Sequence, residues 1–311
     1  MKLISFVFSF RNEEKNLKSL IDRVHQAVKK TLKWDYELIF VNDDSSDNSE
    51  NVLLDLQKKF PIKIINMSRR FGTNPCVLAG FENCTGDCII YMDSDLQDPP
   101  ELITELIKQH EKGFDIVHTK RTKRLGEPKF KLFFTNLAYT IIHKLSDINL
   151  EKDVGDFKLI SKRALKKILE QKEYNPYIRG LSVWVGFKQT YVDYVREARE
   201  AGESKFSLFA EGPVSQFIRG VTSYSLKPLY LGVLLGFFAF IFSIILILYA
   251  LYAKATGIAV PGTTGILIVI SFFSGALLST IGIMGIYLAR IFEQTKGRTR
   301  YVIKDIKDYK K

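Results

Sequence analysis

Two long stretches without a charged residue constrain this chain more than any other feature. There are 26 consecutive uncharged residues between Lys227 and Lys254, and 35 between Lys254 and Arg290. A helix of about 20 apolar residues is long enough to cross a bilayer. We therefore expect two transmembrane helices, at 229–252 and at about 264–289.

The charges around these stretches predict their orientation. The chain carries 45 Lys and Arg against 34 Asp and Glu, a net charge of +11. Arg219 and Lys227 precede the first stretch, eight basic residues follow the second, and only Lys254 lies between them. Positive charge marks the cytoplasmic side, so we expect a hairpin with both chain ends in the cytoplasm. Because much of the surplus flanks the membrane, we expect no nucleic-acid partner.

Small residues at four-residue spacing lie in both predicted spans. They are Gly232 with Gly236, and Gly275 with Ser279. Such spacing lets helices approach closely, either within the hairpin or between protomers, so a homo-oligomer is possible.

Before the hairpin, strand-like runs alternate with amphipathic stretches. The runs of either kind cover 3–10, 14–32, 36–41, 49–60, 62–67, 74–84, 88–92, the stretch after Pro99, and 114–118. This alternation over about 120 residues predicts a mostly parallel α/β sheet. Ligands of such sheets bind beyond the carboxyl ends of the strands, so the residues that follow each strand are the candidates for a site.

We divide the chain into four parts. A domain at 1–211 carries the sheet, 212–228 is an interfacial segment, 229–289 holds the two spans, and 290–311 is a basic tail. Within the first part, 129–145 is bulky and apolar with basic ends, which fits either a core helix or a helix in the membrane interface.

The densest chemical signal is YMDSDLQDPPE, residues 91–101. Asp93 and Asp95 alternate with a small residue at a predicted strand end, and the amide of Gln97 follows. Hard oxygen ligands of this kind suit Mg²⁺ or Mn²⁺, which typically keep substrate phosphates as further ligands. The alternative is a structural turn and helix start, which DPPE also predicts. Both can hold, because the helix start would fix the strand end that carries the ligands.

Two other strand ends are also acidic. In VNDDSSDNS, the side chains of Asn42, Asp43 and Asp47 could bind a nucleobase or ribose, and the alternative is a polar turn. Residues 11–14, RNEE, follow the first strand with the same two interpretations. Three acidic ends on one sheet predict a single crevice.

Seven segments in order carry a family resemblance: SFRNEEKNL, VNDDSSDNS, SRRFGTNPCVLAGF, TGDCIIYMDSDLQDPPE, VGDFKLISKRAL, YIRGLSVWVGF and REAREAGESKFS. With the two spans, they resemble the polyprenyl-phosphate glycosyltransferases of the inverting GT-A type, which include bacterial undecaprenyl-phosphate glucosyltransferases and dolichol-phosphate mannose synthases. The resemblance implies a GT-A, Rossmann-like fold, a nucleotide-sugar donor, a polyprenyl phosphate acceptor, Mg²⁺ or Mn²⁺, and a multi-pass protein of the inner membrane with its catalytic domain in the cytoplasm.

The resemblance also implies a nucleotide-sugar site at the first two strand ends. Glu13 falls on the family's nucleotide motif, in which Ser9 and Arg11 replace the usual Pro and Tyr. Asp43 falls on the second Asp of a V-D-D motif, and Asn42 stands where the first Asp is usual. This departure changes the chemistry, since an amide donates as well as accepts hydrogen bonds.

Further roles follow from the resemblance. Asp93, Asp95 and Gln97 fall on the metal and diphosphate motif, and Asp156 falls where the family has an acidic residue close to the acceptor. Arg199 and Lys205 fall on a segment near the phosphates.

A basic run at 120–124, after the strand predicted to end at His118, is the best further supply of cations for the acceptor phosphate, with Arg121 and Arg124 as the residues we expect to bind it. Its alternatives are a solvated loop or a contact with anionic lipid head groups.

We expect the lipid phosphate to attack the anomeric carbon directly, with inversion. A phosphate monoester is already largely ionised at neutral pH, so Asp156 is either a general base or a group that orients a cation, while the ion at Asp95 stabilises the leaving diphosphate. UDP-glucose is the donor that the resemblance favours. GlcNAc, galactose, amino-arabinose or mannose donors, a processive polysaccharide synthase and a membrane-anchored nucleotide-sugar-binding scaffold are the alternatives.

Overall fold

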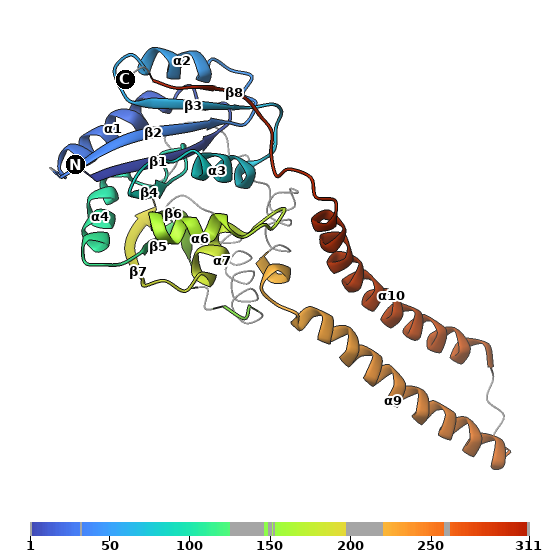
Figure 1. Ribbon diagram of the computed structural model, residues 1–311. Helices are drawn as coiled ribbons and strands as arrows, with labels where there is room; N and C mark the ends of the chain where they lie inside the picture. The colour runs from blue at the N-terminus through green and yellow to red at the C-terminus, as the bar shows by residue number, and fades with distance from the viewer. Residues whose placement is uncertain are drawn as a thin grey trace. The chain divides into compact units, whose positions relative to one another are not determined.

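The computed structural model describes residues 2–31, 33–124, 146–148, 151, 153–196, 220–257 and 262–309. It divides into two compact units, Met1–Ser223 with Arg298–Lys311, and Tyr224–Gly297. The second unit is therefore an insertion in the first, since the chain returns to the first unit after it (Figure 1). The apolar stretch 129–145 and the part of 212–228 that precedes residue 220 lie outside the described residues.

The first unit is built on one sheet. Its strands are β1 (Lys2–Phe10), β2 (Trp34–Asn42), β3 (Ile62–Met67), β4 (Cys88–Tyr91), β5 (Ile116–Arg124), β6 (Val154–Ser161), β7 (Gln189–Arg196) and β8 (Ile303–Lys307). Among the described residues they form an eight-stranded sheet in the order β7-β5-β6-β4-β1-β2-β3-β8. Only β6 and β8 run antiparallel to their neighbours. The predicted mostly parallel α/β sheet is confirmed.

Helices connect the strands. In the first unit they are α1 (Leu17–Lys29), α2 (Ser49–Leu56), α3 (Thr73–Glu82), the 3-10 turn η1 (Pro100–Leu102), α4 (Ile103–Glu111), α6 (Lys162–Leu169) and α7 (Ile178–Trp184). The second unit consists of α9 (Lys227–Ala255) and α10 (Gly262–Thr295).

The sheet separates two apolar clusters, because successive side chains of a strand point to opposite faces. Phe6 and Phe8 of β1 belong to one cluster, together with buried residues of α1, α2 and α4. Val7, between them, belongs to the other, together with buried residues of α3, α6 and α7. The unit therefore has three layers, with helices on both faces of a sheet whose central strands are buried on both sides.

Strand β5 is longer than the sequence predicted. The predicted strand ended at His118, and the basic run 120–124 followed it, whereas β5 continues to Arg124 because its pairing with β7 extends that far. The register shifts between Arg121 and Lys123. The basic run is thus part of an irregular strand, and its interpretation as a solvated loop is wrong.

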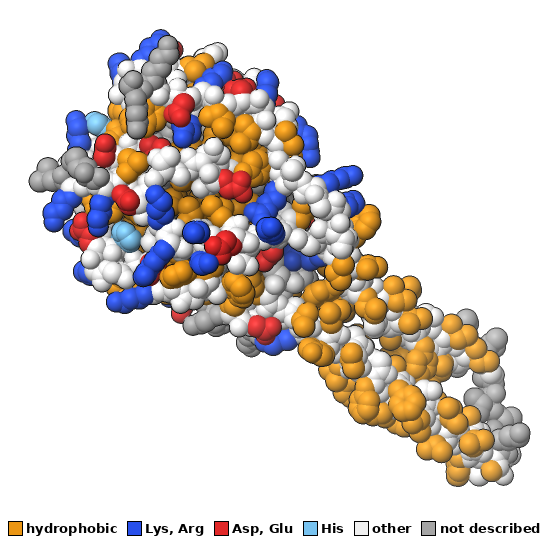
Figure 2. All heavy atoms as spheres, in the orientation of Figure 1, with side chains coloured by type: hydrophobic (Ala, Val, Ile, Leu, Met, Phe, Trp, Pro, Cys, Tyr) orange, Lys and Arg blue, Asp and Glu red, His pale blue; other side chains and the backbone are white. Residues whose placement is uncertain are grey.

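Both helices of the second unit are long and apolar enough to cross a membrane. The candidate spans are Lys227–Ala253, with mean hydropathy 2.9, and Ile268–Thr295, with mean hydropathy 1.9. Their residues are largely exposed, unlike those of the core helix of a soluble protein, and Figure 2 shows hydrophobic side chains along both. A Cβ at Gly232 would lie 3.0 Å from Thr280 Cγ2, whereas one at Gly236 or Gly275 would meet nothing within 4 Å. Of these glycines, Gly232 serves packing between the two helices.

Candidate active site

The segment after β4 places two carboxylates at the carboxyl edge of the sheet. Asp93 Oδ1 accepts a hydrogen bond from the Tyr91 hydroxyl at 3.1 Å, and Asp95 Oδ1 accepts one from the backbone nitrogen of Gln97 at 3.2 Å. Leu96, which lies between Asp95 and Gln97 in the sequence, has a left-handed backbone with φ 57°. Ser94 Oγ donates to the carbonyl oxygen of Ser9, at 3.2 Å. The segment is therefore a tight turn that is tied to the end of β1.

Strand β6 brings a third carboxylate to this edge. Because β6 is antiparallel to β4, with Tyr91 opposite Lys158, its first residues lie beside the residues that follow β4. Asp156 lies there and forms a two-pronged ion pair with Arg179 of α7, with Arg179 Nε 2.8 Å from Asp156 Oδ1. Burial alone would raise the pKa of Asp156, but the Arg179 guanidinium overrides it and holds this pKa well below its ordinary value. Asp156 is therefore ionised at neutral pH.

A second buried ion pair lies next to the first. Arg121 Nε donates to the Tyr194 hydroxyl at 2.9 Å, and its Nη2 lies 3.6 Å from Asp98 Oδ2. The Tyr194 hydroxyl in turn donates to Asp98. The guanidinium packs over Gly155, where a Cβ would come within 2.9 Å of it. A side chain at that position would therefore push the guanidinium of Arg121 away from β6.

The pKa of Asp93 shifts in the opposite direction to that of Asp156. Burial, followed by repulsion from Asp156, Asp95 and Asp98, raises the pKa of Asp93 to about 7. Lys158 is fully buried, which lowers its pKa to about 8 although Asp156 opposes the shift. We call this part of the edge, with the four aspartates and the cations Arg121, Arg179 and Lys158, the charged half.

Two carboxylates of the charged half fit a divalent ion in part. Asp93 and Asp95 offer hard oxygen donors at the end of a strand, the chemistry that Mg²⁺ and Mn²⁺ prefer. No group of three or more His, Cys, Asp or Glu side chains that could hold a metal occurs in the described part of the chain. An ion here would therefore need other oxygen ligands, such as the Gln97 amide, water or a substrate phosphate.

The loops after β1 and β2 are joined to each other. Asn12 and Asp44 both have left-handed backbones, with φ 57° and 58°. Asn12 exchanges hydrogen bonds with Ser46, and the Glu13 amide nitrogen donates to Ser49 Oγ at 3.0 Å. The side chain of Glu13 is half-buried and accepts a hydrogen bond from Asn16. The two predicted nucleotide segments thus form one structure.

Asp43 and Asn42 at the end of β2 are both buried. The Asp43 carboxylate accepts hydrogen bonds from the backbone nitrogens of Phe71, at 2.6 Å, and Gly72, at 3.0 Å from Oδ2, and so fixes the turn that precedes α3. The Asn42 carboxamide donates to Asn66 of β3 at 3.0 Å. We call this second part of the edge, formed by Asn42, Asp43 and Asn66, the amide half.

The structure brings most predicted site residues to one edge. The charged half contains Asp93, Asp95, Gln97, Asp156 and Arg121, and the amide half contains Asn42 and Asp43. Strand β1 lies between the two halves, with Ser9 near its end and Glu13 just after it. Arg199 and Lys205 lie outside the described residues. Arg124 is in β5, but its side chain is outside the described part. The roles assigned to all of these residues remain predictions.

The sequence did not single out several members of the edge. Asp98, Arg179, Tyr194 and Asn66 were not assigned to the site, although Arg179 lies in the segment YIRGLSVWVGF that carries the family resemblance. For Tyr194 and Asn66 no local signal existed, because their importance depends on which strands pair.

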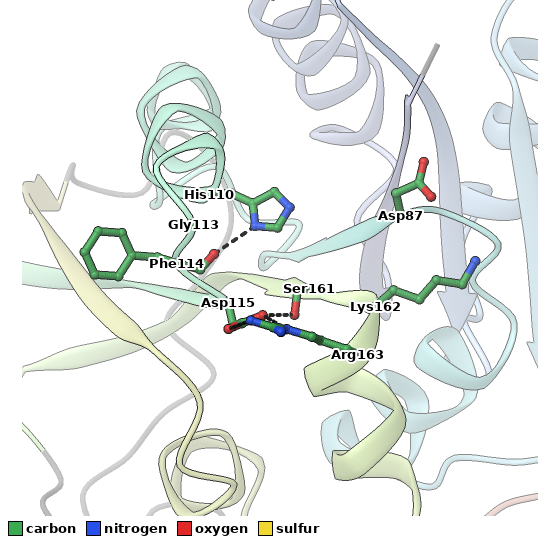
Figure 3. A pocket seen from close by; sticks show the side chains of 8 residues that line it. All are labelled: Asp87, His110, Gly113, Phe114, Asp115, Ser161, Lys162 and Arg163. Carbon is green, nitrogen blue, oxygen red and sulfur yellow. Dashed lines mark hydrogen bonds and ion pairs between the residues drawn. The ribbon is translucent and has the colours of Figure 1, made fainter.

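A cavity of about 320 Å³ lies at the other end of the strands, where the parallel strands begin (Figure 3). Its lining includes Asp87 and Asp115, which precede β4 and β5, and Arg163, which pairs with Asp115. These residues mark the amino ends of the parallel strands, whereas Asp93 and Asp95 follow a carboxyl end. The cavity is therefore separate from the candidate active site.

Comparison with known proteins places the chain among glycosyltransferases. Residues 5–169 match the family model described as Glycosyl transferase family 2. The chain is 37% identical over 304 residues to the "uncharacterized glycosyltransferase YkcC" of Bacillus subtilis, covering 96% of this chain and 92% of the relative. It is 34% identical over 309 residues to the "prophage bactoprenol glucosyl transferase homolog" of Escherichia coli, covering 98% and 99%. A crystal structure of glucosyl-3-phosphoglycerate synthase from Mycobacterium tuberculosis is 17% identical, with a TM-score of 0.48, and covers 65% of this chain and 72% of that one.

Proposed function

The chain belongs to glycosyl transferase family 2, and on that premise we propose that it transfers glucose from UDP-glucose to a polyprenyl phosphate at the cytoplasmic face of a membrane. The observation that carries the proposal is the combination, in one glycosyltransferase, of a carboxylate cluster at the sheet edge with two long apolar helices. The relative from Escherichia coli, whose name states a bactoprenol glucosyl transferase homolog, supports the lipid acceptor, because the match spans 98% of this chain and so includes both helices.

Chain connectivity supports the predicted topology of a membrane hairpin. The segment before α9 and the segment after α10 both belong to the sheet unit. If both helices cross the bilayer, their outer ends must lie on the same side as that unit. The basic residues beyond α10 favour the cytoplasmic side.

The acceptor requires little activation by the protein. A phosphate monoester has a second pKa of about 6 and is mostly a dianion at neutral pH. In the proposed reaction one of its oxygens attacks the anomeric carbon, the bond to the nucleoside diphosphate breaks, and the diphosphate leaves with the bonding electrons from the opposite face. The configuration at the anomeric carbon is inverted.

The protein's task is then to hold two anions together. Its pairing with Arg179 lowers the pKa of Asp156 and so makes this carboxylate a weak base, better suited to orienting that guanidinium towards a phosphate than to accepting a proton. Asp93, Asp95 and Gln97 would hold Mg²⁺ or Mn²⁺, which when bound neutralises charge on the leaving diphosphate. The amide half would bind the nucleotide.

Transfer assays on membranes test this function. Membranes that contain the full chain are incubated with undecaprenyl phosphate, Mg²⁺ or Mn²⁺, and one labelled donor at a time from UDP-glucose, UDP-GlcNAc, UDP-galactose, an amino-arabinose donor and GDP-mannose. We expect label in the lipid fraction with UDP-glucose, and a product of inverted anomeric configuration. Transfer from another donor alone would replace glucose in the proposal, and absence of lipid-linked label with every donor would refute it.

A further inference from the structure

The strand that follows the membrane hairpin docks on the amide half. Figure 1 shows β8 along the outer edge of β3, where Asp305 lies opposite Asn66 in antiparallel register. The docking is reinforced by the Ser68 nitrogen, which donates to the carbonyl oxygen of Val302 at 3.0 Å, and by Gln57, whose Nε2 donates to the carbonyl oxygen of Lys307 at 3.1 Å. The basic tail, whose charges predicted the orientation of the hairpin, therefore also supplies the last strand of the sheet.

Two carboxylates fix the orientation of the buried Asn66 amide. Its Nδ2 donates to Glu50 Oε1 at 2.8 Å and to Asp305 Oδ1 at 2.9 Å. An ionised carboxylate can only accept hydrogen bonds, and an amide nitrogen can only donate them. The Nδ2 of Asn66 must therefore face Glu50 and Asp305, and its Oδ1 must face the other way, towards β2.

The orientation of Asn66 in turn fixes that of Asn42. Asn66 Oδ1 accepts a hydrogen bond from Asn42 Nδ2 at 3.0 Å, and Asn42 Oδ1 accepts one from the backbone nitrogen of Ser45 at 2.9 Å. Rotating the Asn42 amide by half a turn would set oxygen against oxygen at Asn66 and two donors against each other at Ser45. Three hydrogen bonds thus lead in sequence from Asp305 through Asn66 and Asn42 to the loop after β2, and we call them the relay.

We propose that Asp305 is a positioning residue for the nucleotide end of the active site. It acts through Asn66, whose amide it helps to orient, and Asn66 holds the amide of Asn42. The inference rests on the proposed function, under which Asn42 and Asp43 bind the donor nucleotide. It gives the strand after the hairpin a role in donor binding, in addition to its place in the fold.

Glu50 alone does not replace Asp305. Glu50 Oε1 also accepts a hydrogen bond from Lys307, so this one oxygen serves two donors. Without Asp305, one N–H of the 6% exposed Asn66 loses its acceptor at the β8 side. A buried donor without an acceptor destabilises the fold, so the Asn66 amide would no longer be held as strongly in a single orientation.

The test compares three variants of the full chain in detergent. Asp305→Ala removes the acceptor, and Asp305→Asn keeps an oxygen that can accept from Asn66. Asp308→Ala is the matched control, because it removes an acidic residue that follows β8, pairs with Lys63 at 3.6 Å and takes no part in the relay. The measurements are UDP binding by calorimetry with Mg²⁺ present, the KM for UDP-glucose, kcat, and the thermal midpoint.

We expect Asp305→Ala to weaken UDP binding roughly fivefold and to raise the donor KM by a similar factor, which corresponds to the loss of about one hydrogen bond. The kcat should change much less, since the charged half is untouched. Asp305→Asn and Asp308→Ala should bind UDP like the wild type. A residue that served stability alone would lower the thermal midpoint and the active fraction without changing the KM.

Two outcomes would overturn the inference, and they differ. If the wild type bound UDP and Asp305→Ala bound it equally well, the relay would fall and the proposed function would stand. If the wild type bound no UDP, both would fall. Should Asp305→Ala fail to fold, Asp305→Leu, which has a similar branched shape and no acceptor, takes its place with the same expected result.

Discussion

The two halves of the candidate active-site edge use different chemistry. In the charged half, carboxylates face guanidinium groups: Asp156 pairs with Arg179, and Asp98 lies beside Arg121. In the amide half, two neutral carboxamides face each other, and the Asp43 carboxylate is satisfied by backbone nitrogens. Charged pairs are strong in a partly buried site, whereas amides are weaker but have directional donors and acceptors.

This difference matches the two parts of the proposed donor. A diphosphate is recognised by its charge, and a nucleobase by a pattern of donors and acceptors. Substitutions in the charged half should therefore act mainly on the rate of transfer, and substitutions in the amide half should act mainly on donor binding. Three substitutions can break or sharpen this division, and a fourth tests the docking of β8 beside the amide half.

The largest effect should come from Asp95→Asn. It keeps the shape of the side chain and removes the charge, so the developing charge on the leaving group loses its counter-ion site. We expect transfer to fall by about 100-fold or more, in line with the loss of one electrostatic contact to a transition state. The measurement is sugar transfer at saturating Mg²⁺. Asp87→Asn, at the other end of β4, is the control and should transfer normally; near-normal transfer by Asp95→Asn would contradict the assignment.

Arg179→Gln tests the ion pair of the charged half. The side chains of Arg179 and Asp156 are only 16% and 25% exposed. The substitution would therefore leave the Asp156 carboxylate without its partner where little water can replace it. We expect a loss of about 1–3 kcal/mol in the free energy of unfolding and a lower kcat. The matched control is Arg23→Gln, which breaks a two-pronged pair with Glu101. There the side chain of Glu101 is 53% exposed, so water replaces its partner and thermal unfolding should change little.

Asn42→Asp tests the amide half. The substitution restores the residue that the resembling family usually has, yet here it would place a carboxylate against Asn66 Oδ1, which cannot turn away while Glu50 and Asp305 hold its nitrogen. We expect a loss of about 1–2 kcal/mol in stability and a higher donor KM. Asn48→Asp, nearby and exposed, should be neutral. A fully stable Asn42→Asp variant would show that the relay does not constrain this position.

Ile303→Ala should have the smallest effect. Ile303 packs against the apolar cluster that includes α3, whereas Ile306, on the same strand, is 45% exposed. Removing part of a half-buried side chain should cost about 1 kcal/mol, and Ile306→Ala should cost almost nothing. Equal thermal midpoints for the two variants would indicate that β8 is not docked in this register.

Much of the architecture could be predicted because its signals are local. The alternating runs predicted β1 to β4 and the helices between them, since burial on both faces of a parallel sheet demands continuous apolar strands. The two uncharged stretches predicted α9 and α10. The end of β5 was misplaced, because Lys120 and Arg121 do not look like strand residues, and pairing with β7 overrides their preference.

The candidate site was predictable only in part. Asp93 and Asp95 could be identified because two carboxylates and a strand end lie within a few residues. Arg179 could not be linked to Asp156, since nothing in the sequence between these residues, which lie 23 positions apart, indicates that α7 returns to the start of β6. Asn66 was missed for the same reason, because its partners Asn42 in β2 and Asp305 in β8 are both distant in sequence.

By itself, the sequence determined the parallel core of the sheet, the apolar helix pair and the acidic turn after β4, because periodicity, missing charge and adjacent carboxylates are properties of neighbouring residues. The tertiary structure decided the rest. It inserted β6 in the reverse direction beside β4, which brought Asp156 to Asp93, and it laid β8 on β3, which brought Asp305 to Asn66. Strand order depends on hydrogen bonding between segments far apart in the chain, and no local pattern encodes it.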